Sequence, residues 1–261
     1  MTIISKLAGM IAGVVAICLA VSPPAQADSR LQKILESGVI KVGTTGDFNP
    51  MTIRDVASGE YKGFEIDAAN RLAKDLGVKA EFVATDWKTM VAGVLSGKYD
   101  IVMSGTSIDV GRAKVVGYTM PYVYVGTVPM TLKANAGRFK TWDDANKPGV
   151  KVSVILGTIF EQQAREAFPN ATIVTVEAPA TGYQEVLAGR ADVTISSNVD
   201  AASITQRFEA MQQFGGEVRN RRPLGYITAQ DDFVFINFLN AWLAINEANG
   251  FFKDLSSRWG L

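Results

Sequence analysis

The sequence contains no histidine, and Cys18 is its only cysteine. Histidine is the commonest general base near neutral pH and the commonest protein ligand of zinc. Its absence excludes cysteine–histidine zinc sites and histidine-assisted nucleophiles. The 26 basic and 26 acidic side chains cancel, so nothing indicates a polyanionic partner such as nucleic acid. We expect no cofactor and no metal, and the isolated loop carboxylates Asp47 and Asp109 are not assigned as metal ligands.

Residues 1–27 have the pattern of a secretory signal peptide. A basic start at Lys6 is followed by an apolar run over residues 7–21, which is short for a bilayer span of ~20 residues. The segment ends in small residues at 25–27, and the residue before Cys18 is too large for a lipid-attachment site. We therefore predict cleavage before Asp28 and a cysteine-free mature chain in the periplasm.

The chain after residue 27 alternates short β-branched runs with amphipathic helical stretches, which is typical of the α/β fold class. Ser29 is expected to cap the first helix, and glycines at 38, 77 and 97 are expected to end helices. In this half the pattern predicts helices at 29–37, 66–76 and 90–95 and strands at 39–42, 81–83 and 99–103.

The same rhythm starts again after a turn-rich stretch at residues 143–149. Because both halves show the same alternation of strands and helices, we predict two small α/β lobes. A final helix at 232–249 is expected to pack back on one of them. In the second half the pattern predicts strands at 150–155, 172–176 and 191–195 and helices at 161–168 and 183–187.

Several motifs carry a resemblance to a known family. In chain order they are GTTGDFNP at 43–50, GFEID at 63–67, GKYDI at 97–101, RAKVV at 112–116 and Pro121-Tyr122. Together they resemble the solute-binding proteins of family 3, which deliver polar amino acids to ABC importers. Within that family the chain is most similar to the periplasmic cyclohexadienyl dehydratases, on the evidence of TTGD at 44–47, Trp87, and Ser104-Gly105 followed by Arg112.

The resemblance implies a periplasmic-binding-protein type II fold with two α/β lobes joined by a two-strand hinge. The first lobe would comprise residues 28–125 plus 224–261, and the second residues 126–223. The hinge would lie near residues 124–126 and 225–227. Such a protein is expected to be a monomer that closes on its ligand between the lobes and docks on an ABC permease.

Arg112 is the candidate anchor for a ligand carboxylate, because a guanidinium offers two parallel donors. It follows the strand end formed by Ser104, Gly105 and Thr106, whose N–H groups and Thr106 hydroxyl would meet the same carboxylate. The alternative is a solvated arginine at a helix start.

Aromatic residues are candidate walls for the body of the ligand. Phe48 lies in a Gly-Asp-Phe-Asn-Pro turn and Trp87 at a helix start, although each could instead be ordinary core. In the second lobe, the loop at 157–161 resembles the family's Gly, small residue, Thr, any, Glu pattern. There Thr158 can donate a hydrogen bond, and Phe160 replaces the asparagine of the dehydratases.

The second lobe departs from the pattern of amino-acid binders. An ungapped match puts Ser197 where the family usually has the aspartate that pairs the ligand's ammonium. A serine there leaves a buried ammonium without an anionic partner, which costs several kcal/mol. We therefore hypothesise a carboxylate ligand with an apolar or ring-shaped body and no obligatory ammonium. Asn198 or Asp200 could substitute if the loop shifts, although Asp200 could equally be a helix-start residue.

These residues favour a binding protein that captures a small carboxylate-bearing solute, such as an amino acid or a related aromatic acid. The alternative is a prephenate or arogenate dehydratase, in which the resemblance makes Asp200 the general acid. Asp200 is one methylene shorter than the glutamate of the dehydratases, and Phe160 lacks the hydrogen bonds of their asparagine. Because a displacement of about 1 Å can cost about 100-fold in rate, these departures weigh against turnover.

Overall fold

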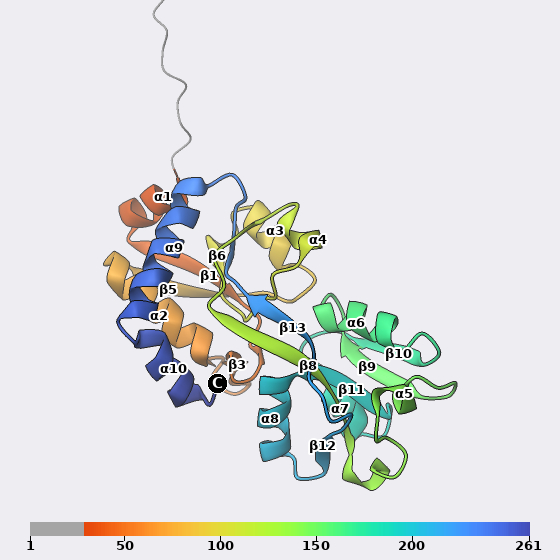
Figure 1. Cartoon of the computed structure of the whole chain (residues 1–261). Helices are drawn as coiled ribbons and strands as arrows, with labels where there is room; N and C mark the ends of the chain where they lie inside the picture. Colours follow the sequence, from red (N-terminus) through yellow and green to blue (C-terminus); the bar gives the residue numbers. More distant parts are fainter. Residues whose placement is uncertain (1–28) are drawn as a thin grey trace, which may run out of the picture.

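The structure of the protein is a computed structural model that describes residues 29–261. The predicted signal peptide, residues 1–27, lies outside this range. Within residues 29–261, no helix has both the length and the apolar character needed to cross a bilayer. Two groups of helices and strands, each around its own sheet, lie side by side (Figure 1). The predicted α/β class and two-lobe arrangement are confirmed.

The first lobe is built on a five-stranded sheet. β1 pairs in parallel with β5 and β6, so the carboxyl ends of these three strands meet at one edge. β14 joins antiparallel and links β6 to β7. The strand order is β5 (Lys79–Ala84), β1 (Val39–Thr44), β6 (Ile101–Val102), β14 (Ile227–Thr228) and β7 (Gly117–Tyr118). A small antiparallel sheet follows β1 and consists of β2 (Asp47–Phe48), β3 (Thr52–Arg54) and β4 (Tyr61–Lys62).

The helices of the first lobe begin and end largely where the sequence predicts. Ser29 caps α1, because its hydroxyl accepts a hydrogen bond from the Gln32 N–H. Gly38 and Gly77 end their helices in the left-handed conformation that glycine tolerates. The helices are α1 (Arg30–Ser37), α2 (Phe64–Leu76), α3 (Met90–Leu95), α4 (Val110–Ala113), α9 (Phe233–Ala248) and α10 (Phe251–Trp259).

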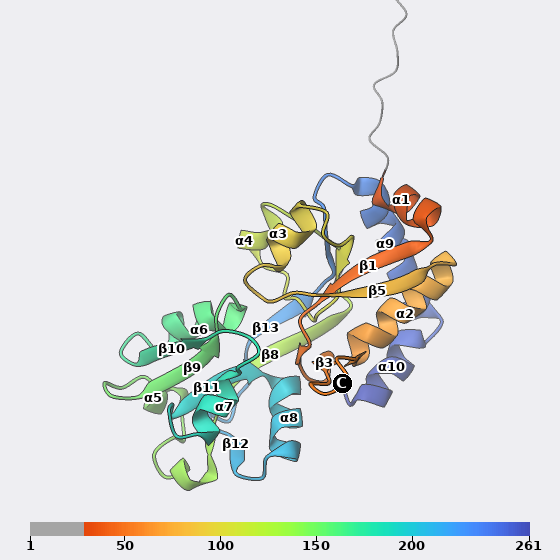
Figure 2. The ribbon, with the colours of Figure 1, turned by 180° about the vertical axis from the view of Figure 1, so that it is seen from behind.

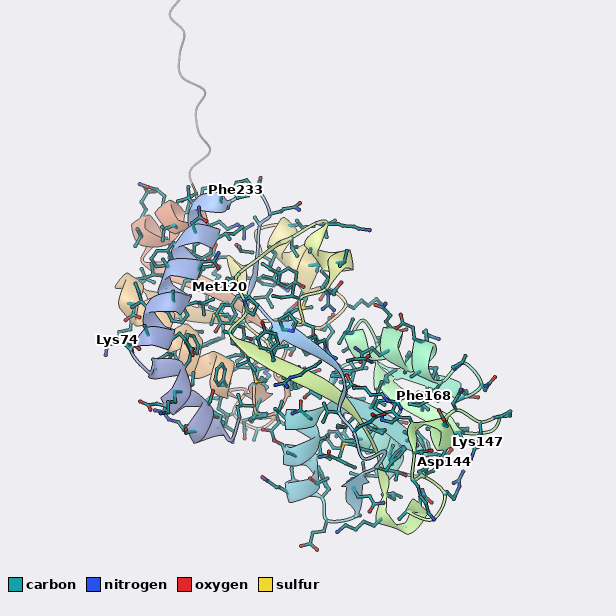
Figure 3. The ribbon with its side chains drawn as sticks, viewed as in Figure 1. Lys74, Met120, Asp144, Lys147, Phe168 and Phe233 are labelled. Carbon is teal, nitrogen blue, oxygen red and sulfur yellow. The ribbon has the colours of Figure 1, made fainter. Side chains whose placement is uncertain are left out.

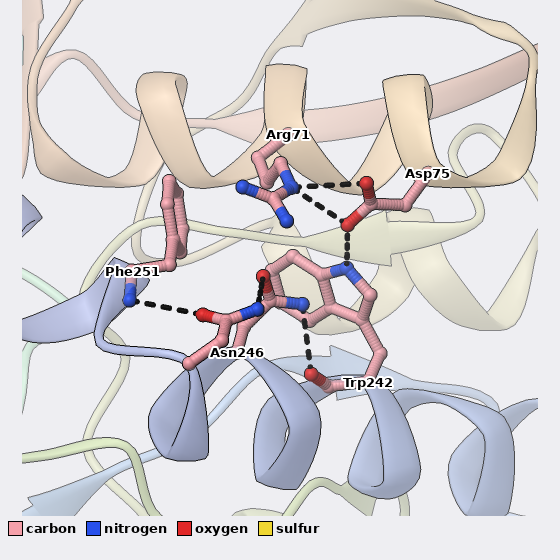
Figure 4. Close-up of polar contacts among 6 residues, drawn as sticks. Arg71, Asp75, Trp242, Asn246 and Phe251 are labelled. Atoms are coloured by element: carbon pink, nitrogen blue, oxygen red, sulfur yellow. Dashed lines mark hydrogen bonds and ion pairs between the residues drawn. The ribbon is translucent and has the colours of Figure 1, made fainter.

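The end of the chain packs back on the first lobe through α9 and α10. The Trp242 indole N–H on α9 donates to Asp75 on α2 at 2.9 Å, and Arg71 pairs with the same carboxylate at 2.8 Å (Figure 4). The Arg71 guanidinium also lies over the Phe251 ring, 4.9 Å from its centroid. Phe235, Leu239 and Leu243 of α9 join the apolar core of this lobe. The predicted return of the C-terminal helix is thus confirmed.

The second lobe is built on a mixed six-stranded sheet. β9 pairs in parallel with β10 and β11, whereas β8 runs antiparallel to β11, β12 and β13. The strands are β8 (Val123–Leu132), β9 (Lys151–Ile155), β10 (Thr172–Val176), β11 (Val193–Ser197), β12 (Met211–Gln213) and β13 (Arg219–Leu224). The helices are α5 (Trp142–Ala145), α6 (Ile159–Ala167), α7 (Gly182–Leu187) and α8 (Asn198–Arg207), with a short 3₁₀ turn at Lys133–Asn135.

A separate apolar core stabilises the second lobe. Phe168 stacks on Trp142 with ring centroids 5.7 Å apart, and both side chains are buried. Figure 3 places Phe168 within this lobe and the ion pair between Asp144 and Lys147 at its far end. Separate cores allow each lobe to keep its shape while the two move relative to one another.

Two long strands connect the lobes. β8 leaves the first lobe and β13 returns to it, and the two pair from Leu224 opposite Val123 to Arg219 opposite Thr127. Both views of the ribbon show this pair passing between the two lobes (Figures 1 and 2). The predicted two-strand connection is therefore present.

Candidate functional site

A pocket lies between the lobes at the carboxyl ends of β1, β5 and β6. It is lined by residues of both lobes and by the two connecting strands. The predicted site residues that line it are Phe48, Trp87, Gly105, Arg112, Thr158, Phe160 and Asp200. Polar lining residues that sequence reasoning did not assign to the site are Asp47, Ser107, Thr181, Tyr183, Thr194, Ser196 and Arg222.

An aromatic wall in the first lobe is held in place by the half-buried carboxylate of Asp47. The Trp87 indole N–H donates to both oxygens of Asp47, at 2.9 and 3.0 Å. The Phe48 ring meets Trp87 edge-on with centroids 6.2 Å apart. Gly105 has φ +68° and leaves room for Phe48, because a Cβ there would lie 2.7 Å from the Phe48 ring. The sequence motifs around residues 47 and 105 therefore shape one wall together.

Arg112 extends from the short helix α4 toward the second lobe. Asp109 caps α4 by accepting the Arg112 backbone N–H at 2.9 Å, and its carboxylate lies 3.4 Å from the Arg112 guanidinium. The guanidinium donates to the Gly157 carbonyl of the second lobe at 3.0 Å. Arg112 thus forms a contact across the mouth of the pocket while it lines the pocket itself.

A second guanidinium, that of Arg222 on β13, also lines the pocket. It donates to the hydroxyls of Ser107 and Thr127, both at 2.8 Å, and lies 4.8 Å from the centroid of the Phe160 ring. Burial lowers the pKa of Arg222 to about 10, and the charge of Arg112 contributes in the same direction. Arg222 therefore stays cationic at neutral pH. Nothing in the sequence separates it from its exposed neighbour Arg221.

Two carboxyl groups line the pocket as well. Asp200, in the first turn of α8, accepts a hydrogen bond from the Ser196 hydroxyl. Burial raises the pKa of Asp200 to about 7, and the nearby charge of Asp47 adds to the effect. Burial likewise raises the pKa of Asp47 above its usual range. The pocket thus brings together two cationic groups and two carboxyl groups from both lobes.

Three predicted ligand residues, Ser104, Thr106 and Ser197, are buried and lie outside the pocket lining. The Ser104 hydroxyl is engaged by the Thr45 N–H at 2.9 Å and by Thr44. The Thr106 carbonyl accepts the Gly225 N–H, which ties its loop to the chain beside β14. These residues shape the loop after β6 without lining the cavity.

Ser197 is a helix cap. Its hydroxyl accepts the Asp200 N–H at 3.0 Å and so fixes the start of α8. Asn198 is also engaged elsewhere, since its side chain accepts the Gly126 N–H at 2.8 Å. Asp200 reaches the pocket instead. The pocket thus has an acidic side chain at residue 200, so Ser197 alone gives no reason to exclude an ammonium group from the ligand.

Two α/β lobes that enclose a pocket and are joined by two strands define the periplasmic-binding-protein type II fold. Residues 40–261 match the profile of the bacterial extracellular solute-binding proteins, family 3, and the chain belongs to this family. The predicted resemblance is confirmed.

Known relatives include an enzyme as well as binding proteins. The cyclohexadienyl dehydratase of Pseudomonas aeruginosa is 32% identical over 237 residues, which cover 89% of this chain and 86% of that protein. The L-cystine-binding protein of Escherichia coli is 29% identical over 229 residues, which cover 88% and 85%. The crystal structure of an ancestral amino acid-binding protein, a precursor of cyclohexadienyl dehydratase, is similar with a TM-score of 0.83 at 39% identity, covering 88% of this chain and 99% of that one.

Proposed function

We propose that the mature protein is a monomeric periplasmic receptor that captures a small carboxylate-bearing solute between its lobes and delivers it to an ABC permease. The observation that carries the proposal is Arg112, which lines the pocket in the first lobe and also bonds the Gly157 carbonyl of the second. A ligand carboxylate on this guanidinium would join the two lobes. Such a ligand stabilises the closed form by contacts that exist only when the lobes meet.

The ligand class is an amino acid or a related organic or aromatic acid. Phe48 and Trp87 offer an apolar wall, which suits an aliphatic or ring-shaped body. Asp47 and Asp200 offer carboxylates to a cationic group, so an ammonium group is compatible with the pocket. The cystine-binding and ancestral amino acid-binding relatives support the same class.

The binding function is tested with protein that has been unfolded and refolded to remove carried-over ligand. Thermal unfolding is recorded with amino acids, keto acids and aromatic carboxylates. At ~100 times its dissociation constant a ligand adds about 2.7 kcal/mol, which raises the midpoint by about 5–10 °C. No shift with any carboxylate, amino acids included, would contradict the proposal.

Arg112→Ala tests whether Arg112 binds the ligand carboxylate. We expect it to weaken binding at least ~30-fold by calorimetry, because truncating one partner of a buried charged pair costs about 2–5 kcal/mol. Arg165→Ala is the control, since Arg165 is an exposed arginine of α6 that pairs only with Glu161 among the described residues. Retained affinity in Arg112→Ala would refute the carboxylate assignment.

The second candidate function is a prephenate or arogenate dehydratase. It is favoured by the relative of that name and by Asp200, a buried carboxyl group whose pKa of about 7 suits a general acid. The test is incubation with prephenate and detection of phenylpyruvate. Formation of product that Asp200→Asn abolishes would establish the enzyme. A thermal shift with prephenate but no product would leave a binding protein.

A further inference from the structure

Arg222 is a buried cation for which the described part of the chain supplies no anion. Its side chain is among the buried ones, at 8% exposure. No ion pair among residues 29–261 includes Arg222. Its partners are the Ser107 and Thr127 hydroxyls, the Gln163 side-chain oxygen at 3.5 Å and the Asn220 carbonyl. All four are neutral, and the Nη2 group has no hydrogen-bond partner among residues 29–261.

A buried guanidinium without these partners destabilises the folded protein unless a ligand supplies them. A buried charge normally has a counter-ion, and a buried donor normally has an acceptor. Arg222 has neither at Nη2, although it lines the pocket. The Phe160 ring over the guanidinium face restricts the plane of the group and leaves its edge for hydrogen bonds. The geometry is that of an anion-binding group without its anion.

Both guanidinium groups contact the segment that begins α6, since Arg112 donates to the Gly157 carbonyl and Arg222 lies over the Phe160 ring. Asp200 lies on another element, in the first turn of α8. Asp109 lies 3.4 Å from the Arg112 guanidinium and gives Arg222 no salt bridge. This end of the pocket therefore carries two guanidinium groups, which is one more than a single ligand carboxylate requires.

We propose that Arg222 binds a second acidic group of the ligand, so that the solute carries two acidic groups, one held by Arg112 and the other by the Nη2 edge of Arg222. This inference rests on the proposed binding function and narrows its ligand class to solutes with two acidic groups. It also gives the connecting strand β13 a direct contact with the ligand, because Arg222 lies on that strand.

The test uses pairs of compounds that differ only in one acidic group. They are L-glutamate with L-glutamine, succinate with succinamate, and terephthalate with its monoamide. Calorimetry is performed on the refolded protein, Arg222→Met and Arg221→Met. Arg221 is the control because it is exposed on the same strand. Methionine keeps the apolar stem of the arginine and removes its charge.

We expect the compound with two acidic groups in at least one pair to bind wild type at least ~10-fold more tightly than its amide. Arg222→Met should bring that ratio close to one while Arg221→Met preserves it. Equal affinity of both members in every pair that binds, or a ratio that Arg222→Met leaves unchanged, would overturn the inference and keep the binding function. If no pair binds but a monocarboxylate does, the inference also fails. If no carboxylate binds, the binding function itself fails.

A second measurement separates ligand binding from a structural role. The ligand-free Arg222→Met protein should unfold at the same temperature as wild type or higher, because the variant removes a buried cation without a counter-ion. A midpoint that falls by more than about 5 °C, together with loss of affinity for both members of each pair, would assign Arg222 to the fold and overturn the inference.

Discussion

Glu65, at the start of α2, is a fully buried carboxyl group whose environment favours its neutral form. Tyr122 and the Gly105 N–H both donate to its Oε1 atom, the latter at 2.8 Å. Burial is the dominant effect and raises the pKa of Glu65 to about 8, although the two hydrogen bonds act in the opposite direction. The side chain thereby supports the loop at Gly105 from inside the first lobe.

Because the pKa of Glu65 is raised on folding, the stability of the protein depends on pH. Between an unfolded pKa near 4.5 and a folded pKa of about 8, the folded state holds a proton that the unfolded state has released. The contribution of Glu65 to stability is therefore fully present below pH ~4.5. It is lost as the pH rises toward 8, at up to ~1.4 kcal/mol per pH unit.

Glu65→Gln removes this titration and keeps an oxygen that can accept both hydrogen bonds. We expect its free energy of unfolding, measured with urea, to fall less between pH 5 and pH 7.5 than that of wild type. Asp200 also titrates in this range but does so in both proteins, so it cancels in the comparison. Parallel pH profiles for the two proteins would contradict the assignment.

At the residue scale, the site was predictable where a motif fixed a local geometry. Arg112 follows the Ser-Gly-Thr strand end, and Phe48 ends β2 directly before a turn; both line the pocket, as predicted. Asp47 was identified only as a loop carboxylate, because its hydrogen bond to Trp87 joins residues 40 positions apart. Arg222 was missed because burial on β13 depends on pairing with β8, which local sequence does not encode.

Among the elements, α9 and α1 share one capping residue. Asp232 accepts the Phe235 N–H at 2.9 Å at the start of α9, and its other oxygen accepts the Arg30 N–H at 2.5 Å at the start of α1. The first of these bonds is a local N-cap at the first residue of the helix predicted over 232–249. The second bond joins segments 202 positions apart and requires the folded lobe.

Asp232→Ala removes both bonds at once. Loss of an N-cap costs about 0.5–2 kcal/mol, and the unpaired Arg30 N–H adds to this. We expect the midpoint of thermal unfolding, followed by circular dichroism, to fall by about 3–8 °C. Asp231→Ala is the control, because Asp231 is exposed and its change should stay within ~1 °C. An equal loss in both variants would refute the shared cap.

Where element boundaries differ from the prediction, tertiary pairing explains them. The expected turn at 143–149 contains the end of α5, because Thr141 and Asp144 form a capping box. The strand expected at 191–195 runs instead from Val193 to Ser197, opposite Thr131 to Thr127 of β8. The segment around Met211 pairs with Leu132 of β8 as β12 and so lies outside α8. The hydrophobic periodicity of the sequence predicts which helices and strands are present, and their pairing in the folded protein determines where they end.

For the whole molecule, the order of the family motifs was enough to predict two lobes and their connection, but not the contact that closes them. That contact places Gly157 of the second lobe against the backbone of Lys88 in the first, beside the bond from Arg112 to the Gly157 carbonyl. An exposed ion pair between Lys88 and Glu177, at 3.6 Å, lies next to it. Exposed pairs contribute little, so the packing at Gly157 matters more.

Gly157→Ala tests whether this contact governs closure. A Cβ at residue 157 would lie 3.0 Å from the Lys88 Cα and N atoms, which belong to the backbone of the other lobe and cannot rotate away. The clash therefore raises the free energy of the closed form and not that of the open form. Because fewer molecules can then close, the apparent affinity for the ligand falls in proportion. We expect at least ~10-fold weaker binding of any carboxylate that binds wild type, although residue 157 brings no side chain to the ligand.

The control for Gly157→Ala must carry the same backbone strain without the contact. Gly149 does so, since its φ of +86° is close to the +79° of Gly157 and a Cβ there would meet nothing within 4 Å. Both variants should lose similar stability, but Gly149→Ala should bind normally. Small-angle scattering with saturating ligand should show compaction for wild type and Gly149→Ala and a smaller change for Gly157→Ala. Equal affinity in the two variants would mean that closure does not depend on this contact, and that the ligand joins the lobes by its own contacts alone.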